Sequence, residues 1–178
     1  MLKTSKYIKD KVLIADGVNT TLDYTKEATG VDLSVKNFYK ISSPGILLQK
    51  KTIVGDYELI EKHDWMYKGH SFIGWYLPKG TYICALNEGC KFGPKDVGYI
   101  VLRSSLNRNG VSLISAVWDP QFTTQNENGV DTMSVRITVG SDQGIYIEEN
   151  ARVGQLMVFE IEEGATQYEG QFQNKGLK

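Results

Sequence analysis

The sequence has no long apolar run and is poor in cysteine and histidine. No stretch of eighteen consecutive apolar residues occurs in the 178-residue chain, so no membrane-spanning helix is expected. The two cysteines, Cys84 and Cys90, have no Cys or His companions at zinc-site spacing, which favours buried free thiols. The two histidines, His63 and His70, lie in a polar stretch without a third ligand and are expected on the surface or in a loop.

The chain also lacks a strong charge of either sign. Twenty Lys and Arg residues stand against 21 Asp and Glu residues, which gives a formal net charge of −1. This balance gives no reason to expect nucleic acid or an anionic membrane as a partner, so a phosphate site would have to be a local group of cations. The N-terminal residues carry no signal-peptide core, so a cytoplasmic location is expected.

Long segments with a helical period are scarce, and the chain predicts an all-β fold. Between residues 38 and 97, short apolar runs are separated by turns that contain Gly or Pro. Apolar and polar residues alternate at 31–35 and at 133–139, which is the period of a half-buried strand. Further strands are expected at 46–48, 52–54, 57–60, 72–77, 81–86, 145–147 and 153–161.

The remaining segments suggest a single domain with two less regular ends. A short helix is expected at 5–14, and a polar loop that contains Asn-Gly is expected at 123–132. No linker rich in Gly, Pro or Ser divides the chain. We therefore expect one domain over 1–178, with an N-terminal extension at 1–27 and a C-terminal arm at 162–178.

The stretch 98–122 carries the side chains that most suggest chemistry. Its first part, 99–102, is an apolar run that predicts a buried strand. Arg103, Ser104 and Ser105 follow at once. A planar guanidinium group beside two hydroxyl groups suits an oxyanion such as phosphate.

The second half of this stretch predicts a partner strand and a carboxylate. Asn109 and Gly110 predict a tight turn into the apolar run 111–117, so the two runs are expected to form a hairpin. The hairpin would end at Asp119, which a stiff proline, Pro120, follows. An anion cradle and a carboxylate on neighbouring strands suggest phosphate-ester chemistry.

Further segments stand in a family order around this stretch: 28–33 (ATGVDL), 77–80 (LPKG), 85–88 (ALNE), 150–159 (NARVGQLMVF) and 168–171 (YEGQ). Together with Arg-Ser-Ser and Asp-Pro, they resemble the superfamily of trimeric dUTPases and dCTP deaminases. The resemblance runs from about residue 28 to residue 173. It implies a distorted β-barrel or β-clip fold, and a homotrimer with active sites at its subunit interfaces.

The resemblance also implies residue roles. Asp119 matches the aspartate that activates the water attacking the α-phosphate in dUTPases. Phe122 matches a ring placed against the deoxyribose, and Asp32 matches an aspartate that reaches a magnesium-bound triphosphate through water. The other substrate-binding residues would be Arg103, Ser104, Ser105, Arg108, Gln155, Tyr168 and Gln171.

Each of these positions also has a plain structural interpretation. Arg103 could be a solvated charge at a strand end, and Asp119 could cap a turn. Phe122 could be ordinary core. Asp32 could bond backbone amides of a neighbouring loop, and Gln155 could make a polar contact along its strand.

Departures from the family pattern leave the reaction open. The deaminases carry a glutamate on the strand after Asp-Pro-x-Phe, where this chain has Arg136, although Glu127 in the longer preceding loop could replace it. The glycine-rich C-terminal motif of trimeric dUTPases is missing, and one residue is missing between Ser115 and Asp119. We predict a dUTP diphosphatase that uses Mg²⁺, with a deoxyribonucleoside triphosphate and further copies of the chain as partners. The alternatives are a dCTP deaminase and a non-catalytic nucleotide-binding protein.

Overall fold

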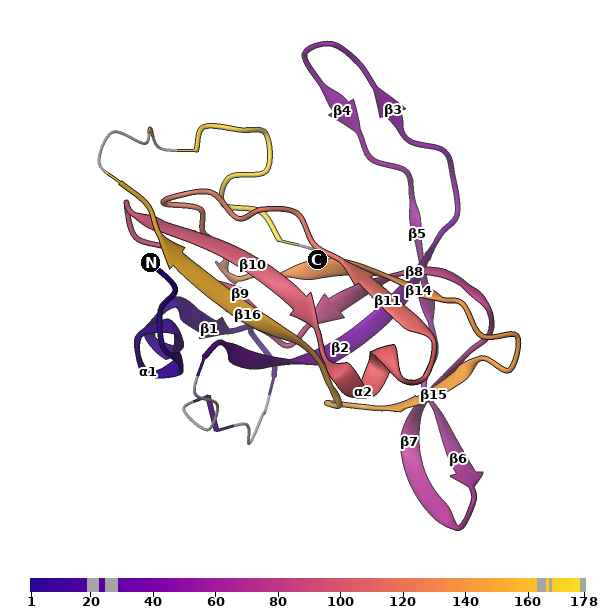
Figure 1. Cartoon of the computed structure of the whole chain (residues 1–178). Coiled ribbons are helices and arrows are strands. Elements are labelled where there is room, and N and C mark those ends of the chain that lie inside the picture. Colours follow the sequence, from indigo (N-terminus) through magenta and orange to yellow (C-terminus); the bar gives the residue numbers. More distant parts are fainter. Residues whose placement is uncertain (19–22, 25–28, 163–165, 167, 177–178) are drawn as a thin grey trace.

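Strands make up most of the regular structure, which confirms the all-β prediction (Figure 1). The structure is a computed structural model and describes residues 1–18, 23–24, 29–162, 166 and 168–176. Its helical turns are α1 (Ser5–Ile8), η1 (Lys9–Lys11) and α2 (Ser104–Asn107). Its strands are β1 (Val12–Ile14), β2 (Val31–Ile41), β3 (Ile46–Leu47), β4 (Thr52–Ile53), β5 (Tyr57–Ile60), β6 (His63–Tyr67), β7 (His70–Leu77), β8 (Gly80–Leu86), β9 (Glu88–Cys90), β10 (Asp96–Leu102), β11 (Val111–Ile114), β12 (Gln125–Asn126), β13 (Gly129–Val130), β14 (Ser134–Val139), β15 (Ile145–Glu148) and β16 (Arg152–Glu160).

The central sheet curls until it nearly closes into a barrel. Its antiparallel strands follow the order β10–β16–β2–β8–β14–β11, and β5 pairs with the end of β2. The two edges meet again where Gly98 of β10 and Trp118, beyond β11, exchange backbone hydrogen bonds of 2.9 Å. Alternate residues of these strands point inward, as the period of two requires. The largest fully buried side chains include Trp75, Phe38, Ile8, Leu33, Leu77 and Leu86.

The hairpin predicted between the two apolar runs of 99–117 was wrong. β10 pairs with β16, β11 pairs with β14, and α2 lies between them. Leu106, which is buried, anchors this helical turn to the core. Gly110 has a φ of +72° and its N–H bonds the carbonyl of Asn107 at 3.1 Å, so it ends the helical segment instead of forming a two-residue hairpin turn.

The N-terminal segment is helical over a shorter range than predicted. Helical structure begins at Ser5 and stops at Lys11, and Val12–Ile14 then pair with β9. These three residues are apolar and two of them are β-branched, which favours a strand, and β9 provides the strand with which they pair. None of the helices in the described ranges is long and apolar enough to cross a membrane.

The predictions for the cysteines and for the histidines are both confirmed. Cys84 and Cys90 are buried free thiols. His63 and His70 are exposed, but they lie in β6 and β7 and not in loops. The polar loop predicted at 123–132 contains the two-residue strands β12 and β13, which pair with each other.

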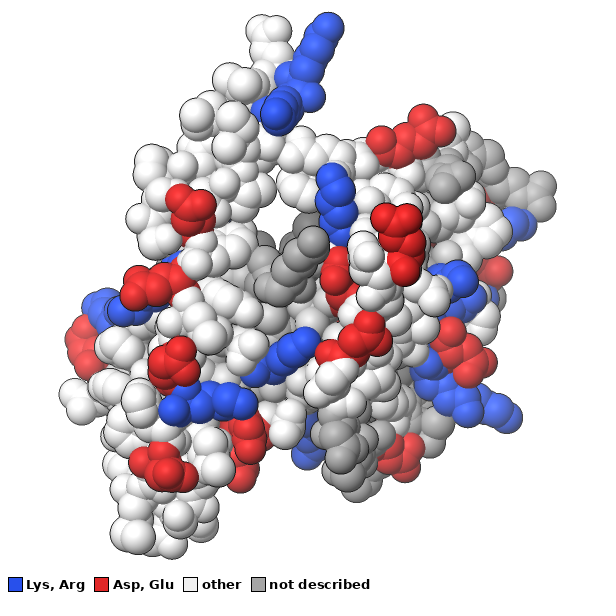
Figure 2. Space-filling model, turned by 180° about the vertical axis from the view of Figure 1, so that it is seen from behind, with Lys and Arg blue, Asp and Glu red and all other residues white. Residues whose placement is uncertain are grey.

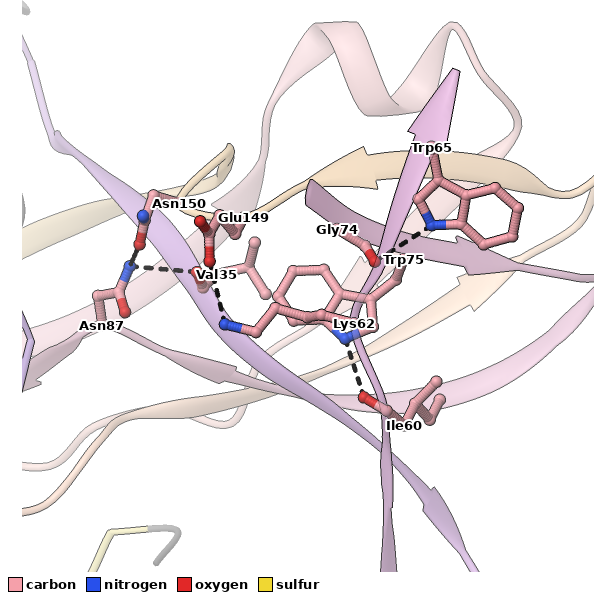
Figure 3. A network of polar contacts seen from close by, with 9 residues as sticks. All are labelled: Val35, Ile60, Lys62, Trp65, Gly74, Trp75, Asn87, Glu149 and Asn150. Atoms are coloured by element: carbon pink, nitrogen blue, oxygen red, sulfur yellow. Dashed lines mark hydrogen bonds and ion pairs between the residues drawn. The ribbon is translucent and has the colours of Figure 1, made fainter. Parts of the chain in front are cut away.

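Two hairpins project from opposite ends of the body (Figure 1). One is β3–β4, and the other is β6–β7, whose second strand also pairs with β15. Polar contacts fix the base of the second hairpin, as Figure 3 shows. The indole N–H of Trp75 donates to the carbonyl of Ile60 at 2.9 Å, and Lys62 pairs with Glu149 at 3.0 Å. On the face shown in Figure 2, residues of both charge signs are interspersed, as expected from the net charge of −1.

A buried carboxylate, Asp96, joins the N-terminal helical turns to β10. It accepts hydrogen bonds from the Tyr7 hydroxyl at 2.7 Å and the Gly93 N–H at 2.8 Å, and it pairs with Lys11 at 3.2 Å. Burial raises the pKa of Asp96, but these donors outweigh it, so the pKa lies below the usual aspartate value. Since the folded-state pKa is the lower one, this stabilisation is present above the unfolded-state pKa and is lost as the pH falls through the folded-state pKa.

Replacing Asp96 with asparagine is therefore expected to lower the free energy of unfolding by about 1–3 kcal/mol at pH 7, because the charge that strengthens these hydrogen bonds is removed. Chemical denaturation at pH 7 and near pH 3 would measure it, and the difference from wild type should shrink at the lower pH. Tyr7→Phe removes one hydrogen bond only and serves as the control, with an expected loss of about 1 kcal/mol. An Asp96→Asn protein as stable as wild type at pH 7 would contradict the prediction.

Candidate active site

Two arginines meet at one buried carboxylate on the central sheet. Asp32 of β2 is 6% exposed, and one of its oxygens contacts the guanidinium group of Arg103. Its other oxygen accepts a hydrogen bond of 2.9 Å from Arg152 of β16. Gln155 lies directly opposite Asp32 in the β2–β16 register, so their side chains share one face. Together with Ser104, three of these residues (Asp32, Arg103 and Gln155) line a hollow of about 270 Å³, which we call the phosphate cradle after the ligand that the sequence predicts for it.

The phosphate cradle has the charge and donors that an oxyanion needs. In the lining, Arg103 and Asp32 offset each other. Arg152 contacts Asp32 without lining the hollow, and it brings the formal charge of these three side chains to +1. The side chains of Arg103 and Arg152 are 24% and 43% exposed. A half-buried, paired Arg103 does not fit the interpretation as a freely solvated strand-end charge. Asp32 bonds guanidinium groups, where the structural alternative expected backbone amides. Its carboxylate orients the two forks, which can present their remaining N–H groups to a ligand.

The sequence analysis predicted no functional role for Arg152. It lies three residues before Gln155, and strict alternation would place the two side chains on opposite faces. The β2–β16 register shifts between Arg152 and Gly154, so that Val153 is not paired with a residue of β2 and its side chain is buried in the core. This bulge lets Arg152 reach Asp32. The only sequence feature that could have pointed to Arg152 is its position as a single arginine at the start of an apolar strand.

Asp119 lies in a second hollow of about 290 Å³, which we call the aspartate hollow. Its carboxylate is half-buried and makes no side-chain hydrogen bond within the described part of the chain. The backbone carbonyl of Asp119 accepts a bond of 3.1 Å from the Phe122 N–H, so Asp119 does begin a turn. Phe122 is 5% exposed, and its ring centroid lies 5.1 Å from that of Trp118 and 5.7 Å from that of Tyr168. Phe122 is thus core packing and a wall of the hollow at once.

The C-terminal segment forms the remaining wall of the aspartate hollow. Gln173 donates a hydrogen bond of 2.9 Å to the carbonyl of Gln121, and Phe172 and Lys175 line the hollow. The side chain of Gln171 points elsewhere. It accepts a hydrogen bond of 3.1 Å from the Thr52 N–H and donates one of 2.7 Å to the Thr52 carbonyl, on the β3–β4 hairpin.

Within one chain, the predicted site residues therefore lie in separate groups. Ser105 is exposed beside Ser104, at the start of α2. Arg108 lines a third hollow together with Tyr67 and Lys68. The structure brings together Asp32, Arg103, Ser104 and Gln155 in the phosphate cradle, and Asp119, Phe122 and Tyr168 in the aspartate hollow.

The other carboxylates considered from the sequence lie away from Asp119 in the part of the chain that the structure describes. Among the described residues that line the aspartate hollow, Asp119 is the sole acid. Arg136 is exposed on β14, and Glu127 lies in the β12–β13 turn, at a different hollow. Glu88 is fully buried, where burial raises its pKa to about 7, and it accepts hydrogen bonds of 3.0 and 2.9 Å from the N–H and hydroxyl of Ser34.

Comparisons with known proteins show what this chain is similar to. The sequence profile of the dCTP deaminase-like family matches residues 3–161. A probable deoxyuridine 5′-triphosphate nucleotidohydrolase of Archaeoglobus fulgidus is 28% identical over 174 residues, which cover 97% of this chain and 93% of the relative. A relative of the same name from Aeropyrum pernix is 30% identical over 152 residues, which cover 85% of this chain and 86% of the relative.

A solved structure supports the fold. The 2′-deoxycytidine 5′-triphosphate deaminase of Agrobacterium tumefaciens superposes with a TM-score of 0.61 at 13% identity. The match covers 88% of this chain, and this chain spans 46% of that protein. At that identity the likeness concerns the fold alone, and it confirms the predicted barrel-like architecture.

Proposed function

This chain belongs to the dCTP deaminase-like family, and we propose that it hydrolyses dUTP to dUMP and pyrophosphate. The observation that carries the proposal is Asp119, the sole acid among the described residues of its hollow. Its carboxylate makes no side-chain hydrogen bond in the described ranges, so it is available to a water molecule. Deamination would need a proton-shuttling acid beside the base, and Arg136 stands where the deaminases have theirs. The names of the archaeal relatives point to the same reaction.

In the proposed reaction, Asp119 acts as the general base. A water molecule bonded to its carboxylate attacks the α-phosphorus and gives its proton to Asp119. A new P–O bond forms, and the bond from the α-phosphorus to the leaving pyrophosphate breaks. Arg103, Ser104 and Gln155 would hold the phosphate oxygens and offset the charge that develops on them.

The aromatic cluster would select the sugar. The ring of Phe122 is packed against Trp118 and Tyr168 and so cannot move aside easily. A deoxyribose that lies against this ring would leave neither space nor a hydrogen-bond partner for a 2′-hydroxyl group. We therefore place the sugar in the aspartate hollow and the phosphates in the phosphate cradle.

Magnesium fits this arrangement through Asp32. A carboxylate has about four lone-pair sites, and the two guanidinium contacts of Asp32 leave some of them for a metal-bound water. Mg²⁺ commonly keeps several waters and binds through substrate phosphates and one or two carboxylates. When bound, it would neutralise charge on the triphosphate.

Among the described residues, the phosphate cradle and the aspartate hollow share no lining residue in one chain. A single substrate must contact both, so we propose that the cradle of one copy faces the aspartate hollow of the next in a homotrimer. The purified protein should then have a mass near three times 20.0 kDa. Light scattering coupled to size exclusion would measure it. A monomer that keeps full activity would show that the site is complete within one chain.

A single assay tests the reaction. The protein is incubated with Mg²⁺ and either dUTP or dCTP, and pyrophosphate and deaminated base are measured separately. We expect pyrophosphate from dUTP and no uracil nucleotide from dCTP. Deaminated product from dCTP would assign the deaminase reaction instead, and tight binding without either product would assign a non-catalytic nucleotide-binding protein.

A further inference from the structure

The β6–β7 hairpin and β15 present an aromatic outer face. Alternation and register place one set of side chains together, because directly opposed residues share a face. The other face of this small sheet carries Trp75, Leu77 and Ile147, which are buried in the core. Apart from Gly74 and Glu148, the outer set is made of rings: His63, Trp65, Tyr67, His70, Phe72, Tyr76 and Tyr146.

Tyr146 holds these rings in a fixed platform. Its ring centroid lies 4.9 Å from that of Tyr67, with an angle of 27° between the ring planes, and 5.1 Å from that of Trp65. The indole N–H of Trp65 donates to the carbonyl of Gly74 at 3.2 Å, as Figure 3 shows. Tyr67 remains 46% exposed at the tip of the hairpin. The platform therefore offers a pre-positioned ring to solvent.

A hollow of about 620 Å³ lies beside this platform, which is the size of a small-molecule site. Its walls come from the hairpin tip, the turn after α2 and the loop between β14 and β15. Lys68 and Arg108 contribute two positive charges, and none of the described lining residues is acidic. The amides of Asn109 and Gln143 add neutral hydrogen-bonding groups.

We propose that this hollow, here named the ring-and-cation hollow, is a second ligand site that binds a nucleoside phosphate. Tyr67 and Tyr146 provide aromatic surface for a base, and stacking of this kind tolerates any base because every base has a π-face. Lys68 and Arg108 provide the charge for the phosphate. A simple inorganic anion would use the cations and leave the rings unused, which is why the geometry favours a ligand with both parts.

This assignment does not depend on the proposed hydrolysis. The lining residues of the ring-and-cation hollow are absent from the phosphate cradle and the aspartate hollow. The family resemblance implied that Arg108 binds the substrate, whereas in the structure Arg108 lines the same hollow as Lys68 and Tyr67. The test therefore relies on those two neighbours and not on Arg108.

Calorimetric titration with thymidine 5′-triphosphate tests the proposal. We expect a binding event that Tyr67→Ala weakens about tenfold or more, the range measured for the loss of one stacked ring. Lys68→Gln should weaken the same event, because it removes a positive charge that faces the phosphate. Arg103→Ala should leave that event unchanged. Tyr67→Phe keeps the ring and should bind as wild type does. Lys50→Ala, which removes an exposed lysine in the turn between β3 and β4, is the charge control.

Three results would overturn the second site. One is the lack of any binding event that responds to Tyr67→Ala or Lys68→Gln in proteins whose unfolding transitions match wild type. Another is inorganic phosphate binding as tightly as the nucleotide, which would leave an anion site without a base. The third is loss of dUTP turnover, or of the oligomer, in both variants, which would assign the hollow to the substrate site or to a subunit contact.

Discussion

Asp119→Asn is expected to lower dUTP turnover by about 10²–10⁴-fold, the usual effect of removing a general base, while nucleotide affinity stays nearly constant. The amide keeps the shape of the side chain but cannot accept a proton from water. The carboxylate makes no side-chain hydrogen bond in the described residues, so the exchange breaks no structural contact there. Pyrophosphate release at saturating dUTP measures turnover, and calorimetry with a non-hydrolysable dUTP analogue measures affinity.

Arg136→Gln is the matched control for this prediction. Arg136 is exposed on β14 and does not line the aspartate hollow, so its loss should change turnover little. Rapid hydrolysis of dUTP by the Asp119→Asn protein would end the proposed mechanism. If activity instead fell with Glu127→Gln and uracil nucleotide formed from dCTP, the deaminase alternative would hold.

The sequence was sufficient for strands whose burial alternates. Val135, Ile137 and Val139 point into the core from β14, and polar residues between them point out, so a period of two marked this strand. It was not sufficient for the pairing of β10 and β11. Asn109-Gly110 is a strong local signal for a hairpin, but a buried Leu106 makes one helical turn more favourable and sends the two strands to different neighbours.

The candidate site was predictable in its residue types and less so in its geometry. Arg103, Asp32 and Gln155 lie together, because β2 and β16 bring distant motifs side by side. Arg152 was missed because strict alternation of side chains does not reveal a β-bulge, and the bulge after Arg152 changes the face on which its side chain lies. The contact of Gln171 with Thr52 could not be foreseen, since it depends on where a projecting hairpin and the tail come to lie.

Arg103→Ala is expected to weaken triphosphate binding by about 2–4 kcal/mol, the usual loss when one partner of a desolvated charge pair is deleted. This corresponds to a rise in Kd of about 30- to 1,000-fold. Two effects add in this direction. The phosphate loses a planar donor fork, and the formal charge of the group formed by Asp32, Arg103 and Arg152 falls from +1 to zero, because Asp32 then faces Arg152 alone. Calorimetry with a non-hydrolysable dUTP analogue would measure the change.

Arg103→Lys and Arg152→Ala separate these two effects. Lysine keeps the charge but not the paired N–H groups, so Arg103→Lys should lose less affinity than Arg103→Ala. Arg152→Ala lowers the charge equally but leaves the Arg103 fork in place, held by Asp32. A smaller loss for Arg152→Ala than for Arg103→Ala would show that the fork contributes beyond its charge. If instead Arg103→Ala bound the analogue as tightly as wild type, with an unchanged unfolding transition, the Asp32–Arg103 pair would be a structural ion pair, and the phosphates would have to bind elsewhere on the protein.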